Sequence, residues 1–181
     1  CDDGALRAKV AANARTMGSD LRSRLDTAIV ALPVSEPSLH EERLFTEEFV
    51  LVRREAEVGK PVPNVESLRE MRLLLLEEGH CFREQALSFC AGSGAVPRDL
   101  MEGSALSTLV QMVGAGIGVT LIPQMAVAIE TRSAPVSVAR FDAPAPSRTI
   151  GMIWRRTTPL ADQLAEVARI VRMAGTEQPQ G

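Results

Sequence analysis

The fold of this chain is decided by the stretch SALSTLVQMVGAGIGVTLIP, residues 104–123. Four of its apolar residues are spaced as i, i+3, i+4 and i+7, the period of one helix face: Leu106, Leu109, Val110 and Val113. This spacing predicts a helix with Ser104 as its N-cap. The glycines at 114 and 116 then predict a tight turn, and residues 117–122 form an apolar block typical of a buried strand.

The same alternation of strands and helices continues on both sides of this stretch. Further strands are predicted at residues 27–32, 48–53, 73–76, 136–141 and 149–154. A second helix is predicted after Thr158 as N-cap, with an apolar stripe at Leu160, Leu164, Val167 and Val171. Residues 5–25 show a loose helical spacing, and residues 60–64 (KPVPN) form a loop. The alternation predicts an α/β protein with a largely parallel sheet.

The composition excludes several classes of protein. The chain has 181 residues and a net charge of −3, and 45% of its residues are hydrophobic and 24% charged. These values exclude global disorder, collagen and coiled coil. The apolar run at residues 116–127 contains a proline and is shorter than the ~20 residues of a membrane span. The acidic balance argues against unaided DNA binding, and three cysteines are too few for a secreted disulfide scaffold.

The segment EEGHCFREQALSFC, residues 77–90, carries the candidate chemistry. Its apolar spacing at Phe82, Ala86 and Phe89 predicts a helix that starts near Cys81 and runs past Cys90. In the first turn of a helix, the dipole lowers the pKa of a thiol and favours the thiolate, the form that reacts with peroxide. The neighbouring His80 is a candidate for supporting that thiolate by a hydrogen bond or a positive charge.

Helix geometry sets a condition on any bond between Cys81 and Cys90. Nine residues of helix separate their Cα atoms by about 13–14 Å and direct the side chains to opposite sides. A disulfide requires about 4.4–6.8 Å between Cα atoms. Oxidation to a disulfide would therefore have to unwind the helix, so that a chemical event becomes a change of backbone structure.

Other interpretations of these cysteines remain open from spacing alone. Cys90 lies beside the apolar stripe and is compatible with a plain core residue. His80, Cys81 and Cys90 offer three metal ligands without the close pairs of a structural zinc site, and His40 is a possible fourth ligand or a surface loop residue. We expect no cofactor and no metal.

Two further places are candidates for binding. Ser104 and Thr108 would present hydroxyl groups to a ligand at the start of their helix, although Ser104 as a plain cap needs no ligand. Arg148, just before a predicted strand, is a candidate for facing a buried anion such as a thiolate. The glycines at 114–118 follow a helix and precede a strand, the reverse of the phosphate-binding order.

Four segments closely resemble the effector domains of LysR-type transcription regulators that sense hydrogen peroxide. They are residues 25–32 (LDTAIVAL), 79–90 (GHCFREQALSFC), 109–123 (LVQMVGAGIGVTLIP) and 148–151 (RTIG). The glycine and Leu-Ile-Pro pieces are shared by LysR-type effector domains generally, whereas the second segment is specific to the peroxide sensors. The resemblance covers most of residues 25–175, but residues 1–22 match poorly, and Asn13 occupies the position of a pocket threonine.

The resemblance implies a periplasmic-binding-protein-like (type II) fold of two α/β lobes. One lobe would comprise residues 1–46 plus 149–181 and be incomplete, and the other residues 47–148, including the redox cysteines. Cys81 matches the peroxidatic cysteine and Cys90 the resolving cysteine, and His80 and Arg148 match residues that support the thiolate.

The implied function is regulatory. Hydrogen peroxide would form a disulfide that alters homodimer or homotetramer contacts and thereby promoter binding, through a helix-turn-helix domain that this sequence lacks. Glutaredoxin or thioredoxin would reduce the disulfide, and a cytoplasmic location without membrane contact is expected. The chain is then not an enzyme. The alternatives are a metabolite-binding LysR-type effector domain without redox function, a thiol peroxidase, and a solute-binding lipoprotein anchored at Cys1.

Overall fold

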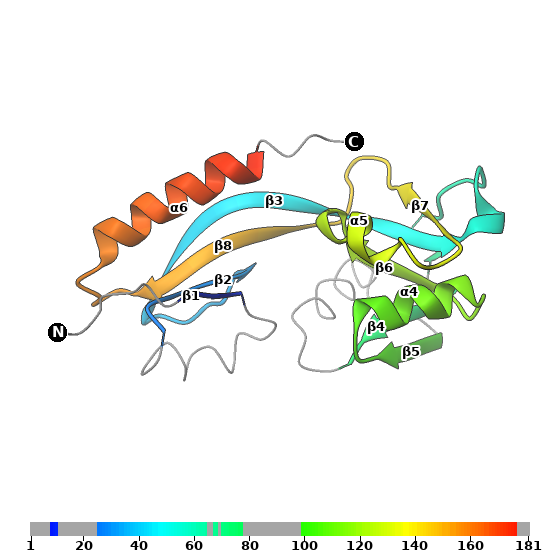
Figure 1. The fold of residues 1–181 in the computed structure, drawn as a ribbon, viewed down its shortest axis with the longest axis horizontal. Coiled ribbons are helices and arrows are strands. Elements are labelled where there is room, and N and C mark those ends of the chain that lie inside the picture. Colours follow the sequence, from blue (N-terminus) through cyan, green and yellow to red (C-terminus); the bar gives the residue numbers. More distant parts are fainter. Residues whose placement is uncertain (1–7, 11–24, 65–66, 69, 78–98, 177–181) are drawn as a thin grey trace. The chain divides into compact units, whose positions relative to one another are not determined.

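The computed structural model describes residues 8–10, 25–64, 67–68, 70–77 and 99–176 (Figure 1). The chain divides into two compact units. Unit 1 comprises Cys1–Thr46 and Arg148–Gly181, and unit 2 comprises Glu47–Ser147. The sequence-based boundary lies one residue later, so that Arg148 groups with unit 1 and not with the second unit.

Unit 1 is built on a sheet of mixed direction. Its strands are β1 (Ala8–Val10), β2 (Thr27–Leu32), the first part of β3 (Leu39–Arg54) and most of β8 (Ser147–Arg155). Strand β2 pairs in parallel with β1 and antiparallel with β8, in a register that runs from Thr27 opposite Trp154 to Leu32 opposite Thr149. Strand β8 is in turn a neighbour of β3.

Helix α6 (Ala161–Thr176) covers one face of this sheet, along β3 and β8 (Figure 1). Its buried residues Leu164 and Ala168 pack in one cluster with Leu44 of β3 and with three residues of β8, Ile150, Met152 and Trp154. The predicted apolar stripe is confirmed, because Leu160, Val167 and Val171 lie against the same cluster. The burial of this stripe fixes the rotation of the helix about its axis.

The described part of unit 2 contains the remaining part of β3, further strands, α-helices and short turns of 3₁₀ helix. The strands are β4 (Arg72–Leu76), β5 (Asp99–Gly103), β6 (Val119–Pro123) and β7 (Val136–Arg140). The helices are η1 (Glu55–Glu57), α4 (Leu106–Gly114), η2 (Gln124–Ala126) and α5 (Val127–Glu130). In the sheet the strands are ordered β7-β3-β6-β4-β5, with β3 antiparallel to its neighbours and β4 parallel to both of its own.

Strand β4 is buried on both faces, as its solid apolar sequence predicts. Leu74 and Leu76 belong to the cluster that packs against Leu109, Val110 and Val113 of α4. The alternate residues of β4 face the opposite cluster, together with Leu51 and Leu121. Because successive side chains of a strand point to opposite faces, four consecutive leucines can serve two cores.

Three expectations about the elements are wrong. The sheet is mixed and not largely parallel, because β3 and β8 pair antiparallel with their neighbours. Strand β3 begins at Leu39, nine residues before the predicted start at Glu48, since its charged first half is held by pairing in the sheet. Residues 8–10, expected in a helix, form β1 through parallel pairing with β2.

Both predicted N-caps are also wrong. Helix α4 is capped by Ala105 in an extended conformation, without a side-chain hydrogen bond, so Ser104 lies one residue outside. Helix α6 begins at Ala161, and the Thr158 hydroxyl accepts a hydrogen bond from the Leu160 amide at 3.3 Å in the preceding turn. Which residue takes the N-cap position depends on where the preceding loop enters the helix, and the packing of that loop against the protein decides this.

In the part of the chain that is described, no helix combines the length and the apolar character needed to cross a lipid bilayer.

Gly118 lies where β6 approaches β4 too closely for a side chain. A Cβ atom added there would lie 2.5 Å from the Arg72 carbonyl oxygen and 3.2 Å from Leu74. We expect Gly118→Ala to lower the free energy of unfolding by about 1–3 kcal/mol, because the sheet must shift to admit the methyl group. Gly59→Asn is the control, since a Cβ there meets nothing within 4 Å and asparagine tolerates its φ of +81°. Urea unfolding measures both, and equal effects would contradict the interpretation.

Candidate functional site

The cysteine segment is attached to the parallel strands β4 and β5. These strands pair in register from Arg72 opposite Asp99 to Leu76 opposite Gly103, and the Glu77 amide donates to the Gly103 carbonyl at 3.1 Å. Residues 78–98 therefore connect the carboxyl end of β4 to the amino end of β5. His80, Cys81 and Cys90 lie in this connection and outside the described residues.

Ser104 and Thr108 lie at the same edge of the sheet of unit 2. Ser104 follows the last residue of β5, and Thr108 is in the first turn of α4; both are exposed. Gly103 allows helix α4 to lie close to the end of β5, because a Cβ atom at this position would lie 2.7 Å from Leu109 Cδ2. The hydroxyl groups of Ser104 and Thr108 thus lie beside the strand end at which the cysteine segment begins.

Arg148 lies where the chain passes from unit 2 to unit 1. It is the second residue of β8 and is half-buried. Two residues earlier, the Pro146 carbonyl accepts a hydrogen bond from the Phe49 amide at 2.8 Å within unit 2. The structure therefore groups Arg148 with unit 1, whereas Ser104 and Thr108 belong to unit 2.

His40 is part of a strand and not of a surface loop, which corrects the expectation. Its ring stacks on Trp154 with 4.6 Å between ring centroids, and its Nε2 lies 3.4 Å from Glu42 Oε2. Glu42 also pairs with Arg172 of α6. Within residues 25–64, 70–77, 99–176 and the shorter described pieces, no three histidine, cysteine or acidic residues are grouped as a metal site would require.

An exposed ion pair on α6, between Glu166 and Arg169, shifts the pKa values of both groups. Arg169 donates to Glu166 through Nε at 2.9 Å and Nη2 at 2.6 Å. These hydrogen bonds lower the pKa of Glu166 and raise that of Arg169. Both side chains are exposed and follow the i, i+3 spacing of a helix surface, so the pair is an ordinary solvated ion pair on the outer face of the helix.

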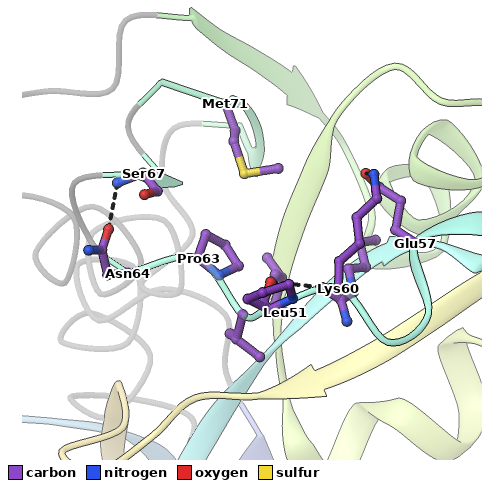
Figure 2. A pocket seen from close by; sticks show the side chains of 10 residues that line it. Leu51, Glu57, Lys60, Pro63, Asn64, Ser67 and Met71 are labelled. Carbon is purple, nitrogen blue, oxygen red and sulfur yellow. Dashed lines mark hydrogen bonds and ion pairs between the residues drawn. The ribbon is translucent and has the colours of Figure 1, made fainter.

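Sequence reasoning missed a pocket of unit 2 beside the end of β3 (Figure 2). This open pocket has a volume of about 540 Å³. It is lined by Leu51, Arg53, Glu57, Lys60, Pro61, Val62, Pro63, Asn64, Ser67 and Met71. In Figure 2, Glu57 and Lys60 lie on one side of it and Asn64 and Ser67 on the other. The local sequence offers one indication of this pocket, which is an arginine at the end of an apolar strand.

The chain matches one family over nearly its whole length. The model of the LysR substrate binding domain matches residues 9–175. A "Probable hydrogen peroxide-inducible genes activator" of Streptomyces viridosporus is 43% identical over 162 residues, which are 86% of this chain and 51% of that protein. The "DNA-binding transcriptional dual regulator OxyR" of Escherichia coli K12 is 34% identical over 151 residues, 82% of this chain and 50% of that protein. The chain thus spans about half the length of these curated relatives.

Solved structures of similar chains have the same fold. A mutant of OxyR from Corynebacterium glutamicum superposes with a TM-score of 0.83 at 29% identity, covering 91% of this chain and 53% of that one. The reduced form of the OxyR regulatory domain from Pseudomonas aeruginosa gives a TM-score of 0.76 at 31% identity, covering 92% and 80%.

The resemblance inferred from the sequence is therefore confirmed. The fold is the expected periplasmic-binding-protein-like α/β fold, and its described units contain the helices and mixed sheets set out above. The curated relatives carry the names of transcription regulators and not of enzymes. This chain belongs to the LysR substrate-binding-domain family.

Proposed function

We propose that this chain is the effector domain of a LysR-type transcription activator that responds to hydrogen peroxide, and that Cys81 and Cys90 carry the response. The observation that carries the proposal is the 43% identity to a protein named a hydrogen peroxide-inducible genes activator, over 162 residues. The sequence Gly79-His80-Cys81, with a second cysteine nine residues on, agrees with it.

The proposed chemistry consumes one peroxide molecule for each disulfide. The Cys81 thiolate attacks one peroxide oxygen, the O–O bond breaks, and the products are a sulfenic acid at Cys81 and, after proton uptake, water. The Cys90 thiolate then attacks the sulfenic sulfur, an S–S bond forms, and a second water leaves. Two thiols are oxidised and one peroxide is reduced to two waters. A dithiol reductant of the glutaredoxin or thioredoxin class reverses the change.

The attachment of the segment supports the placing of this chemistry in unit 2. Cys81 is four residues from Glu77, so its Cα atom stays within about 14 Å of the hydrogen-bonded end of β4. A connection between parallel neighbours usually contains a helix, which agrees with the helical spacing of residues 82–89. Both ends of the segment are attached to strands that pair with each other along their whole length, from Arg72 opposite Asp99 to Leu76 opposite Gly103.

The consequence of oxidation follows from the helix geometry. A bridge between Cys81 and Cys90 cannot form across an intact helix, because about 13–14 Å must shrink to about 4.4–6.8 Å. We propose that His80 and Arg148 stabilise the Cys81 thiolate before the reaction. The altered segment then changes self-association of the effector domain, as a dimer or tetramer, and thereby promoter binding by an attached helix-turn-helix domain.

Peroxide titration of the full chain tests the proposal. One equivalent of hydrogen peroxide is expected to remove two hydrogen atoms from the protein and to give a cross-linked peptide that contains Cys81 and Cys90. Non-reducing peptide mapping by mass spectrometry identifies the pair. Cys1→Ser serves as the matched control and should give the same cross-linked peptide. A bridge that involves Cys1, or thiols that stay reduced, contradicts the proposal.

A further inference from the structure

Arg53 is a buried cation, and no acidic side chain among the described residues pairs with it. It lies on β3 with 7% of its surface exposed and lines the pocket of unit 2. Its Nη1 donates to the Pro61 carbonyl at 3.2 Å, whereas its Nε is buried without a hydrogen-bond partner. Within the described residues, the hydrogen bond to Pro61 is its single polar contact, and the acceptor is uncharged. A buried guanidinium normally has a carboxylate or another anion as partner.

The other two charged residues among the described lining residues form an ion pair. Lys60 and Glu57 form an ion pair with 3.1 Å between Nζ and Oε1, and Figure 2 shows both on one side of the pocket. Among the described lining residues, Arg53 is therefore the charged group without a charged partner. Nη1 is occupied and Nε is shielded from solvent, so Nη2 is the guanidinium nitrogen left for an acceptor in the pocket. A carboxylate oxygen accepts a charge-assisted hydrogen bond from such a donor.

The remaining lining is mostly apolar. Leu51, Val62 and Met71 lie around the pocket together with two prolines, and Asn64 and Ser67 add polar groups. The Asn64 side-chain oxygen is already occupied, because it accepts from the Ser67 amide at 2.8 Å. A volume of about 540 Å³ lies in the range of small-molecule sites. Such a lining suits a ligand with an apolar body and one charged end.

We propose that this pocket is a binding site for a small organic carboxylate, held by Nη2 of Arg53 and by the apolar walls around it. The described residues that line the site lie between positions 51 and 71, whereas the proposed redox cysteines are at positions 81 and 90. The test of the site uses no peroxide, so its failure is distinguishable from failure of the proposed peroxide response.

Thermal unfolding and calorimetric titration of the full chain test the site with hexanoate as probe. Hexanoate is expected to raise the melting temperature in a saturable manner, because it binds the folded state alone. Hexanamide has the same apolar body without the charge, and inorganic phosphate has charge without the body. Both are expected to give no saturable shift. A shift with hexanamide or with phosphate equal to that with hexanoate overturns the proposal, and this comparison needs no variant.

Substitutions locate the binding at Arg53. Arg53→Gln should abolish the hexanoate shift, and Arg53→Lys, whose shorter side chain keeps the charge but does not reproduce the position of Nη2, should weaken binding at least about tenfold. Arg54→Gln is the matched control, since Arg54 is the next residue of β3, is exposed, and lies beside Gly116 outside the pocket. This control should bind hexanoate as the unaltered chain does. Unchanged binding in Arg53→Lys overturns the assignment even if Arg53→Gln fails to fold.

Discussion

Cys81→Ser is expected to abolish the peroxide-dependent bridge completely, whereas Cys90→Ser should stop the reaction at a sulfenic acid on Cys81. A serine hydroxyl stays protonated near neutral pH and does not attack peroxide, so the first variant has no nucleophile at this position. The second variant keeps the nucleophile and loses the thiol that resolves the sulfenic acid. Trapping with dimedone followed by mass spectrometry distinguishes the two products.

The opposite result would contradict the assigned roles of Cys81, which reacts first, and Cys90, which forms the bridge. If Cys81→Ser yielded a sulfenic acid at Cys90 and Cys90→Ser yielded none, the assigned roles would have to be exchanged. Far-ultraviolet circular dichroism adds a second measurement. Peroxide should change the helical signal of the unaltered chain, because bridging requires the helix to unwind, and should leave the signal of Cys90→Ser almost unchanged.

Phe49→Ala is expected to lower the free energy of unfolding by about 3–5 kcal/mol. Phe49 is 1% exposed and lies in the cluster of unit 2 that includes Leu74, Leu109 and Ile122. Removal of its ring takes away buried apolar surface and leaves a cavity that the strand pairing of β3 with β6 prevents from collapsing. Urea unfolding followed by far-ultraviolet circular dichroism measures the loss of free energy of unfolding.

Phe49→Leu is the matched control for this substitution. Leucine keeps most of the apolar volume and should cost less than about 1.5 kcal/mol. A loss under about 1 kcal/mol for Phe49→Ala would mean that the position collapses freely. The description of Phe49 as part of a tightly packed core would then be wrong.

Local sequence patterns predicted those elements whose buried side chains lie close together in the sequence. The strands at residues 27–32 and 73–76 and the apolar stripe of α6 were predicted from their sequences. In these segments the apolar period and the burial agree, because the side chains that drive burial are contiguous in the sequence.

Besides β1, two stretches of strand escaped prediction because partners from elsewhere in the chain hold them. The first half of β3 is rich in charge, and its Arg43 side chain donates to the Thr149 hydroxyl of β8 at 3.3 Å. Strand β5 has the sequence DLMEG, with most of its residues exposed or half-buried, and owes its structure to parallel pairing with β4. Pairing energy between strands depends on the neighbour and is invisible in a local window.

The candidate site was predictable in part. The segment with His80, Cys81 and Cys90 was singled out from residue types and spacing, and the roles of these residues remain proposals. Ser104 and Thr108 lie at the strand edge where that segment begins, which sequence spacing alone did not show. The pocket at Arg53 could not be foreseen, because the Pro61 carbonyl reaches the guanidinium only after the loop folds back on the strand.

By itself, the sequence determined the family, the main helices and buried strands, and the position of the two cysteines in one short segment. The tertiary structure alone decided the mixed direction of the sheet, the parallel pair β4 and β5 that anchors this segment, and the burial of an arginine to which the described residues offer no ionic partner. The physical reason is that periodicity and residue chemistry are local properties of the chain. Strand pairing and the desolvation of a charge arise between segments that meet only in the folded protein.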